Sequence, residues 1–360
     1  MSNKKTINLV IFGIGNVGNT LVNQILEINL KQNDSLNLHI NVPIITNSKK
    51  ALFDEDGISK NWKQDFEKLA ISYSLDDVIN YVLEHNFENL IAIDATASND
   101  IVQHYIPLIK NGFHIISANK IANTLSQEFY QELRTILEKN NKTYLYETNV
   151  GAGLPVIETI KNLYQSGEEI EKIRGVFSGS LSYVFNTFSN SNQPFSKVLL
   201  EADELGLTEP DAREDLSGND VARKLLILAR ELQIEKEINE VTIENLVPIN
   251  LNGKTTLSQF QNRIGELDEV FYEKKRNLNK NEVLRYVGEL DIASEKLEVK
   301  LISENTNSTL GQLKGADSVF EIYSKSYGKN PLVIQGAGAG KEVTARGVLS
   351  DIIKLSKNLN

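Results

Sequence analysis

The order of apolar and polar positions in the first half of the chain predicts short buried strands that alternate with amphipathic helices. Residues 7–12 (INLVIF) form an apolar, β-branched run, which is typical of a strand buried on both faces. Leu21, Ile25, Leu26 and Leu30 then repeat at helical spacing. Further strands are expected at 39–49, 89–96, 113–120 and 143–148, with helices at 101–112 and 126–140. This alternation predicts an α/β fold with a doubly wound parallel sheet.

The pattern changes from about residue 151. A helix is expected at 154–164, followed by a strand-like run that ends at Phe177 and breaks at Ser178-Gly179-Ser180. Further strands are expected at 283–292, 296–303, 318–327 and 331–340, and helical segments at 196–205, 257–277 and 347–359. A mixed sheet covered by helices fits this second half.

The first strand is followed at once by GIGNVG, residues 13–18. Gly13 permits a tight turn, Gly15 lets the backbone approach a pyrophosphate, and Gly18 allows close helix–strand packing. Ile14, Asn16 and Val17 complete the motif. A strand, GxGxxG and a helix in this order predict a dinucleotide-binding site at the positive end of the helix.

The end of the second strand bears on which dinucleotide is bound. An NAD-specific site usually carries Asp or Glu there, to bind the ribose 2′-hydroxyl. This chain has Asn47, Ser48, Lys49 and Lys50 instead. A hydroxyl and two ammonium groups favour a 2′-phosphate and hence NADP, although NAD stays possible because the lysines can simply solvate a loop.

The segment 52–89 is expected to be an insertion of helices. Trp62, Phe66 and Leu69 form an apolar stripe that is interpreted as core. Beyond it, Thr96 and Lys120 each lie at the carboxyl end of a predicted strand, at the edge where open α/β sheets bind ligands.

An acidic stretch from Gly206 to Lys224 (GLTEPDAREDLSGNDVARK) leads into an apolar helix. Ser217 is expected to cap that helix, with Asp220 as its capping-box partner. Asp220 and Lys224 lie one turn apart, which is most often an exposed ion pair worth about 0.3–0.5 kcal/mol. Ile227 falls on the same face and indicates that the face is partly covered, where a lysine beside a carboxylate can move protons.

Composition excludes several functions. The chain has no cysteine, so catalysis by a thiolate and zinc sites with Cys ligands are absent. No tyrosine is followed four residues later by lysine, the spacing of short-chain dehydrogenases. The net charge of −10 argues against nucleic-acid binding, and no apolar run has the length of a membrane span. The absence of a signal-peptide pattern predicts a cytoplasmic protein. The remaining candidates for acid–base catalysis are Lys120, Lys224, Asp220 and Glu209.

The loop NVGAGLP, residues 149–155, follows Glu147. A plain turn is the simpler interpretation. An irregular backbone beside a carboxylate can also hold a hard cation through oxygen ligands.

These motifs resemble those of homoserine dehydrogenase. The resemblance is carried by GIGNVG, SANK before Lys120, ETNVGAGLPVIETIKNL, GVFSGSLSYVFNTF, the acidic stretch and GAGAGKEVTARGV, and it runs over nearly the whole chain. The chain looks most like the dehydrogenase portion of bifunctional aspartate kinase–homoserine dehydrogenases, without a kinase or C-terminal regulatory domain. The resemblance therefore implies no feedback inhibition by threonine through such a domain.

The resemblance implies an activity and an architecture. The family interconverts L-aspartate 4-semialdehyde and L-homoserine with NAD(P)H, in threonine, methionine and isoleucine biosynthesis. It implies a Rossmann domain at 1–147, to which a helix at 341–360 returns, and an α/β catalytic and dimerisation domain at 148–340. A homodimer or homotetramer is expected.

The resemblance also implies residue roles. Lys224 would donate a proton to the aldehyde oxygen, with Asp220 beside it and Lys120 between nicotinamide and substrate. Glu209 and Asp215 would hold the substrate ammonium. Thr96, Gly206, Glu209 and Gly338 would contact the cofactor. A monovalent cation, expected to be sodium, would be held by Glu147 and the carbonyls of Val150, Ala152 and Leu154.

Two rival functions stay open on the sequence alone. One is another NADP-dependent oxidoreductase of amino-acid metabolism with the same fold. The other is a non-catalytic dinucleotide sensor, against which the presence of Lys224 and its neighbouring carboxylates argues.

Overall fold

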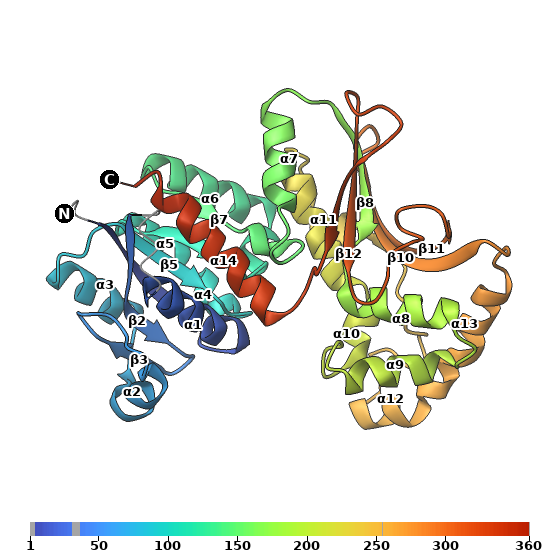
Figure 1. Cartoon of the computed structure of the whole chain (residues 1–360), viewed down its shortest axis with the longest axis horizontal. Helices are drawn as coiled ribbons and strands as arrows, with labels where there is room; N and C mark the ends of the chain where they lie inside the picture. Colours follow the sequence, from blue (N-terminus) through green and yellow to red (C-terminus); the bar gives the residue numbers. More distant parts are fainter. Residues whose placement is uncertain (1–3, 31–36, 254, 360) are drawn as a thin grey trace. The chain divides into compact units, whose positions relative to one another are not determined.

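The computed structural model describes residues 4–30, 37–253 and 255–359 (Figure 1). The outermost ends of the expected domain ranges, residues 1–3 and 360, lie outside the described residues. The chain forms two compact units, Met1–Gly153 with Gly340–Asn360, and Leu154–Ala339. The expected fold class is confirmed, because one unit holds a sheet rich in parallel strands and the other a mixed sheet. No helix in the described part of the chain combines the length and the apolarity that a membrane crossing requires.

The first unit is built on a sheet with the strand order β4-β3-β2-β1-β5-β6-β7. The strands are β1 (Lys5–Phe12), β2 (Leu38–Thr46), β3 (Lys50–Phe53), β4 (Ile71–Ser72), β5 (Leu90–Asp94), β6 (His114–Ser117) and β7 (Tyr144–Leu145). Strands β2, β1, β5, β6 and β7 are parallel, whereas β3 and β4 join the edge in antiparallel pairs. The carboxyl ends of the five parallel strands therefore share one edge of the sheet.

Helices surround this sheet, and the last helix of the chain returns to it. They are α1 (Asn16–Leu30), α2 (Trp62–Leu69), α3 (Leu75–Glu84), α4 (Asn99–Val102), α5 (Tyr105–Lys110), α6 (Gln127–Lys139) and α14 (Lys341–Ser356). Figure 1 shows α14, in red, beside α1, in dark blue. Ile25 of α1 and Val348 and Ile352 of α14 belong to the same buried core as Ile11 of β1.

The segment between β2 and β5 differs in part from the expectation of helices alone. It contains α2 and α3, but β3 and β4 also add two short strands to the sheet. Trp62 and Phe66 are core residues as expected, whereas Leu69 ends α2 and is 64% exposed, so its assignment to the core was wrong. The helix expected at 101–112 is split into α4 and α5, because Pro107 cannot donate a backbone hydrogen bond and is tolerated only in a first helical turn.

The second unit is built on a mixed sheet with the order β13-β12-β8-β10-β11-β9. The strands are β8 (Ile170–Val176), β9 (Thr242–Ile243), β10 (Glu282–Asp291), β11 (Lys296–Asn305), β12 (Ser318–Ser324) and β13 (Leu332–Gly336). All their pairings are antiparallel except that of β9 with β11. The helices are α7 (Val156–Gln165), α8 (Gly179–Asn190), α9 (Phe195–Glu204), α10 (Ala212–Leu216), α11 (Asn219–Glu231), α12 (Leu257–Arg263) and α13 (Leu267–Arg276). Helices α8 and α11 both pack on β10.

Candidate active site

The glycine loop after β1 has the geometry of a phosphate-binding turn. A Cβ on Gly13, whose φ is +93°, would lie 2.6 Å from Thr96 Cγ2, and one on Gly18 would lie 1.9 Å from the Gly13 carbonyl oxygen. Gly15 differs, because among the described residues no heavy atom beyond Gly15 and its two chain neighbours lies within 4 Å of its Cβ position. Helix α1 then begins at Asn16, without an acidic residue in its first turn. The loop is thus tightly packed at Gly13 and Gly18 and open at Gly15, beside a helix N-terminus that favours anions.

The loop after β2 presents a hydroxyl and cationic side chains at the same edge of the sheet. Asn47 Oδ1 accepts hydrogen bonds from the backbone N–H groups of Lys49 and Lys50, both at 2.8 Å. This turn leaves Ser48, Lys49 and Lys50 exposed. The Gly13 N–H donates to the carbonyl of Thr46 at 2.9 Å, which ties the end of β2 to the glycine loop.

A buried carboxylate holds the loop at the end of β5. Asp94 Oδ1 accepts from the Thr96 N–H at 2.8 Å, and its Oδ2 accepts from the Tyr105 hydroxyl at 2.7 Å and from Asn119 Nδ2 at 3.0 Å. Burial raises the pKa of Asp94, and these donors oppose that shift. Thr96 therefore has a fixed position, and half-buried Lys120 follows directly after Asn119. Sequence reasoning missed Asn119, although an Asn next to a strand end was visible.

The proposed cation loop starts with a 3₁₀ turn over Glu147–Asn149. The Glu147 N–H donates to Asp351 Oδ2 at 3.1 Å, and Val150 is buried. Gly151 and Ala152 both have left-handed φ angles, +80° and +52°, which turn the backbone sharply. Leu154 belongs to the second unit. Within the described ranges, no group of three or more His, Cys, Asp or Glu side chains is arranged to hold a metal ion. A site here would depend mainly on carbonyl oxygens.

The start of α11 differs from the expected cap. Gly218, with φ of +77°, precedes the helix, and a Cβ there would lie 2.1 Å from the Tyr286 hydroxyl. Ser217 instead follows the short helix α10 and donates to the Glu214 carbonyl at 2.7 Å. The cap assigned to Ser217 was therefore wrong. A left-handed glycine joins two helices here, and Asp220 forms an ion pair with Lys224.

Lys224 is held on a covered face of α11. Its Nζ lies 2.8 Å from Asp220 Oδ2 and donates to the Phe177 carbonyl at 2.7 Å. The Lys224 side chain is 9% exposed and that of Asp220 47%. Ile227 and Glu231 are buried too, which confirms the expectation of a covered face and contradicts an exposed ion pair. The ammonium group thus has two fixed acceptors and little contact with water.

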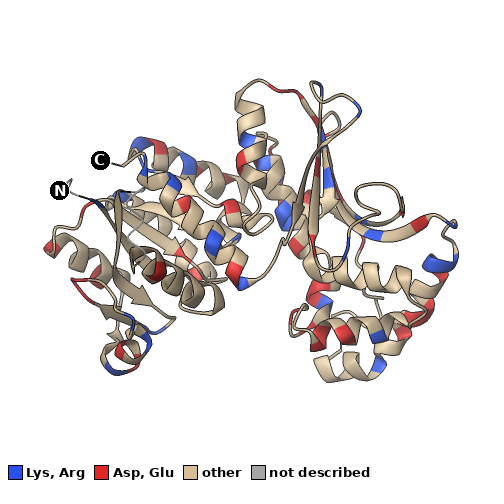
Figure 2. Ribbon diagram, in the orientation of Figure 1, with Lys and Arg blue, Asp and Glu red and all other residues tan. Residues whose placement is uncertain are grey.

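Two further carboxylates lie close to this pair in sequence. Asp215 Oδ1 accepts from the Ser180 hydroxyl at 2.6 Å, and its Oδ2 accepts from the Glu209 N–H at 2.9 Å. Burial raises the pKa of Asp215, and the charge of Asp220 raises it further. Acidic residues are frequent along α9, α10 and the start of α11, as Figure 2 shows in red. Such a group of carboxylates suits an ammonium ligand.

The structure thus joins the Glu209 backbone to Asp215, whose carboxyl also feels the charge of Asp220, and Gly206 lies exposed on the loop that leads to them. Ser180 was not identified as a site residue from the sequence, which showed only the break at 178–180. Gly338 is buried, and a Cβ there would lie 2.1 Å from Ser318 Oγ. Packing against β12 therefore suffices to require a glycine at position 338.

Comparison with known proteins gives consistent matches over both units. Residues 13–147 match the model of the homoserine dehydrogenase NAD-binding domain, and residues 155–353 match the homoserine dehydrogenase model. The bifunctional aspartokinase/homoserine dehydrogenase of Buchnera aphidicola is 41% identical over 98% of this chain, and that of Haemophilus influenzae is 37% identical over 98%. The chain spans 43% of the length of each of these two proteins.

Solved structures show the same fold. A Candida auris protein of unknown function superposes with a TM-score of 0.89 at 35% identity, over 99% of both chains. A hyperthermophilic archaeal homoserine dehydrogenase in complex with NADPH superposes with a TM-score of 0.72 at 22% identity, also over 99% of both chains.

Proposed function

Because this chain belongs to the homoserine dehydrogenase family, we propose that it catalyses the reversible NAD(P)H-dependent reduction of L-aspartate 4-semialdehyde to L-homoserine. The observation that carries this proposal is the covered ammonium of Lys224, held between Asp220 and the Phe177 carbonyl. A dinucleotide sensor has no need of such a group. The family matches over both units favour this reaction over that of another oxidoreductase of amino-acid metabolism. The proposed reaction would belong to threonine, methionine and isoleucine biosynthesis.

Lys224 acts as the proton donor in this proposal. When hydride adds to the aldehyde carbon, the carbonyl oxygen gains alkoxide character, and an adjacent ammonium stabilises and protonates it. In the reverse direction the neutral amine accepts the proton of the alcohol, while the hydride would pass to the oxidised dinucleotide. Asp220 holds the Lys224 amine in place, and Glu209 and Asp215 bind the substrate ammonium.

The dinucleotide is assigned to residues 1–147 with 341–360. Gly13, Ile14, Gly15, Asn16, Val17 and Gly18 would receive the pyrophosphate, which the open space at Gly15 and the N-terminus of α1 support. Ser48 and Lys49 would bind a 2′-phosphate, so NADP is proposed as the preferred cofactor. The exposed Asn47 turn, which presents these two side chains, supports that preference. Thr96, Lys120, Gly206, Glu209 and Gly338 are the remaining proposed contacts.

A monovalent cation, sodium in the first instance, is proposed at Glu147 and the carbonyls of Val150, Ala152 and Leu154. The left-handed turn at Gly151 and Ala152 supports it, because such a turn exposes carbonyl oxygens, the ligands that hard cations prefer. The ion would supply fixed positive charge to this loop. Residues 148–340 are assigned to catalysis and dimerisation, in a cytoplasmic homodimer or homotetramer, as the family resemblance suggests.

Oxidation of L-homoserine, followed by absorbance at 340 nm with NADP⁺ and with NAD⁺, tests the proposed function. We expect turnover with homoserine, a higher kcat/KM with NADP⁺ than with NAD⁺, and little turnover of serine or threonine. Turnover of another hydroxy amino acid in preference to homoserine would support the rival oxidoreductase. Binding of NADPH without turnover of any of them would support a sensor.

A further inference from the structure

Thr96 and Lys120 are carried by separate loops at the carboxyl ends of β5 and β6. Neighbouring strands fix the ends of these loops, since Asp94 is paired with Ser117. Just beyond the strands, the Ala118 N–H still donates to the Asp94 carbonyl at 2.9 Å, whereas the residues further along the two loops are joined by hydrogen bonds from a side chain. Their relative position therefore depends on whatever joins the two loops.

The side chain of Asn119 joins them. Its Nδ2 donates to Asp94 Oδ2 at 3.0 Å and to the Ser98 carbonyl at 2.9 Å, so both amide hydrogens are used on the β5 loop. Its Oδ1 accepts from the Ile121 N–H at 3.0 Å, on the far side of Lys120. Asn119 is 3% exposed. One carboxamide thus connects the loop of Thr96 with the backbone on both sides of Lys120.

The acceptor that Asn119 binds is itself fixed. Asp94 is 1% exposed and also accepts from the Tyr105 hydroxyl and the Thr96 N–H. The Asn119 N–H donates to Ser117 Oγ at 2.9 Å, which holds the start of the β6 loop as well. Because each of these groups has a partner, the carboxamide cannot turn or shift without leaving buried polar atoms unsatisfied.

We propose that Asn119 is a positioning residue that sets the place of Lys120 relative to Thr96. This inference rests on the proposed function, which makes both residues cofactor contacts and, by the family resemblance, places Lys120 between nicotinamide and substrate. Asn119 acts through Lys120 and takes no part in bond making. Since a misplacement of about 1 Å can lower a rate about a hundredfold, losing this connection should impair turnover without removing any reacting group.

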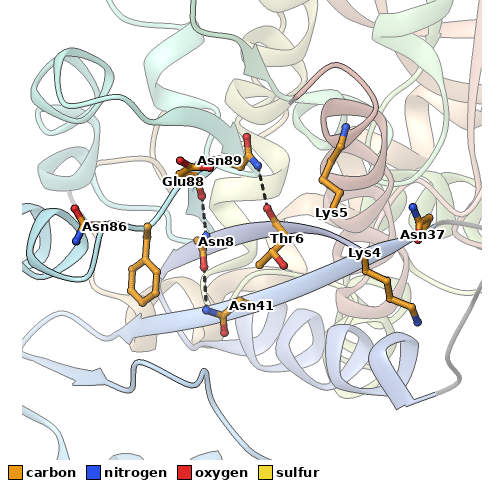
Figure 3. Close-up of a pocket in the computed structure, with 10 residues that line it drawn as sticks. Lys4, Lys5, Thr6, Asn8, Asn37, Asn41, Asn86, Glu88 and Asn89 are labelled. Atoms are coloured by element: carbon orange, nitrogen blue, oxygen red, sulfur yellow. Dashed lines mark hydrogen bonds between the residues drawn. The ribbon is translucent and has the colours of Figure 1, made fainter. Parts of the chain in front are cut away.

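Asn8 provides a matched comparison in the same sheet. It is 5% exposed, its Nδ2 donates to the Glu88 carbonyl at 2.7 Å, and its Oδ1 accepts from Asn41 Nδ2 at 2.9 Å. Figure 3 shows this arrangement at a groove lined by Lys4, Lys5, Thr6 and several asparagines. In the register of β1 and β5, Asn8 is paired with Leu90 and Phe12 with Asp94. Asn8 therefore lies toward the amino ends of these strands, away from the carboxyl ends that lead to Thr96 and Lys120. Both asparagines are buried and bonded twice or more, but only Asn119 contacts the loops in question.

The test is a double-mutant cycle with Asn119→Ala, Lys120→Ala and the double variant, and with Asn8→Ala as the control. We expect Asn119→Ala to lower kcat for homoserine about tenfold or more in the wild-type background but less than about twofold in the Lys120→Ala background. Asn8→Ala should leave kcat within about twofold while lowering the thermal midpoint by a similar amount to Asn119→Ala. A purely structural role for Asn119 would give equal losses in both backgrounds, or an equal loss from Asn8→Ala, and either result overturns the proposal.

The same cycle separates this inference from the proposed function. If the wild-type chain does not oxidise homoserine, the proposed function fails. The dissociation constant of NADPH is then measured for each variant of the cycle in place of kcat. Non-additive effects of Asn119→Ala and Lys120→Ala on that constant would still support the positioning role, and additive effects would overturn it. A Lys120→Ala variant with unchanged kinetics and NADPH binding also overturns it. If Asn119→Ala does not fold, Asn119→Ser, which is too short to reach both loops, replaces it.

Discussion

At the scale of single residues, two acceptors of different kinds hold the amine of Lys224 in position. Asp220 supplies charge, and the Phe177 carbonyl supplies a fixed direction at 2.7 Å. An exposed lysine would sample many rotamers, whereas this one has lost most of that freedom on folding. Its proton is therefore held in one place, as a proton donor in catalysis requires.

Lys224→Ala should lower kcat for homoserine oxidation at least about a hundredfold, because it removes the proposed acid–base group. NADPH affinity should change little, since the proposed role of Lys224 is toward the substrate oxygen. The measurements are steady-state kinetics and fluorescence titration with NADPH. Lys161→Ala is the control, because Lys161 also pairs with a carboxylate of α11, Glu231 at 3.2 Å, but has no proposed catalytic role. Near-normal turnover in Lys224→Ala would remove this residue from the mechanism.

The carboxyl of Asp215 predicts how substrate binding depends on pH. Its pKa is raised by burial and by Asp220, and the hydrogen bond from Ser180 lowers it. Only the ionised form attracts the substrate ammonium, so kcat/KM for homoserine should fall as the pH falls through this raised pKa. Ser180→Ala removes the donor, and the pKa of Asp215 should then rise further. We expect the acid limb of the pH profile to move to higher pH in that variant.

Ser182→Ala is the control for this measurement. Ser182 lies on the same helix and its hydroxyl donates to the Gly315 carbonyl, not to Asp215. An acid limb that stays in place in Ser180→Ala, or moves equally in Ser182→Ala, would show that Asp215 does not govern homoserine binding.

The sequence identified Lys224, its covered face and its partner Asp220, but not the Phe177 carbonyl that binds Lys224 or the Ser180 hydroxyl that binds Asp215. Ile227, one turn from Lys224, was enough to predict the covered face, because helical spacing is a local property. Phe177 and Ser180 lie far from α11 in sequence, and a hydrogen bond between distant segments leaves no local pattern. The error at Ser217 has the same origin, since the Tyr286 hydroxyl, distant in sequence, leaves no room for a Cβ at the left-handed Gly218.

At the scale of elements, the strands of the first unit that could be predicted are those buried on both faces. β1 and β5 were recognisable as apolar runs because helices cover both sides of a parallel sheet. β3 and β4 were missed, since strands of four and two residues are too short to show periodicity. β4 is also exposed, with Ile71 facing solvent. β3 keeps two buried residues, Ala51 and Leu52, so its short length alone accounts for its being missed.

β6 offers a prediction about stability, because burial lowers the pKa of His114 from 6.5 to about 4, with Lys142 contributing. In the folded chain His114 stays neutral and its Nδ1 accepts from the Thr143 N–H at 3.0 Å. The unfolded chain binds a proton near pH 6.5, so the stability due to this residue is present above that pH and is lost as the pH falls toward 4. His114→Asn keeps an acceptor but cannot titrate.

Urea unfolding of the wild type and of His114→Asn at pH 7 and pH 5 measures this contribution. We expect the free energy of unfolding of the wild type to fall by about 2 kcal/mol more than that of the variant between the two pH values. Other titrating groups are common to both proteins and cancel in the comparison. A difference between the two proteins that is the same at both pH values would show that His114 does not titrate in this way.

At the scale of the whole molecule, the order of the strands along the chain and their order in the sheet differ most in the second unit. β8 lies between β10 and β12, although more than a hundred residues separate it from either. Such pairings cannot be read from local periodicity, so the pattern of strands and helices indicated a mixed sheet there without giving the order of its strands. In the first unit, by contrast, the succession of strands and helices along the chain was enough to predict a parallel sheet.

The single tryptophan makes the first unit separately observable. Trp62 is 3% exposed and belongs to the core of that unit, so its fluorescence reports the unfolding of the unit that carries the glycine loop. A ligand that binds only the folded form stabilises it by about 2.7 kcal/mol at a hundred times its dissociation constant. We therefore expect NADP⁺ at that concentration to raise the free energy of unfolding, measured by Trp62 fluorescence, by about 2.7 kcal/mol. The Trp62 transition should move to higher urea accordingly. NADP⁺ is preferred to NADPH because it does not absorb the tryptophan emission.

Gly15→Val is the control that the structure itself supplies. Its Cβ would lie more than 4 Å from every described residue except the two chain neighbours, so the variant should unfold near the wild-type midpoint without nucleotide. The added side chain would occupy the space proposed for the pyrophosphate, and the shift with NADP⁺ should be lost. A variant that is still stabilised by NADP⁺ would place the dinucleotide away from this loop. Loss of stability without nucleotide would instead mean that position 15 is restricted by the fold, as Gly13 and Gly18 are.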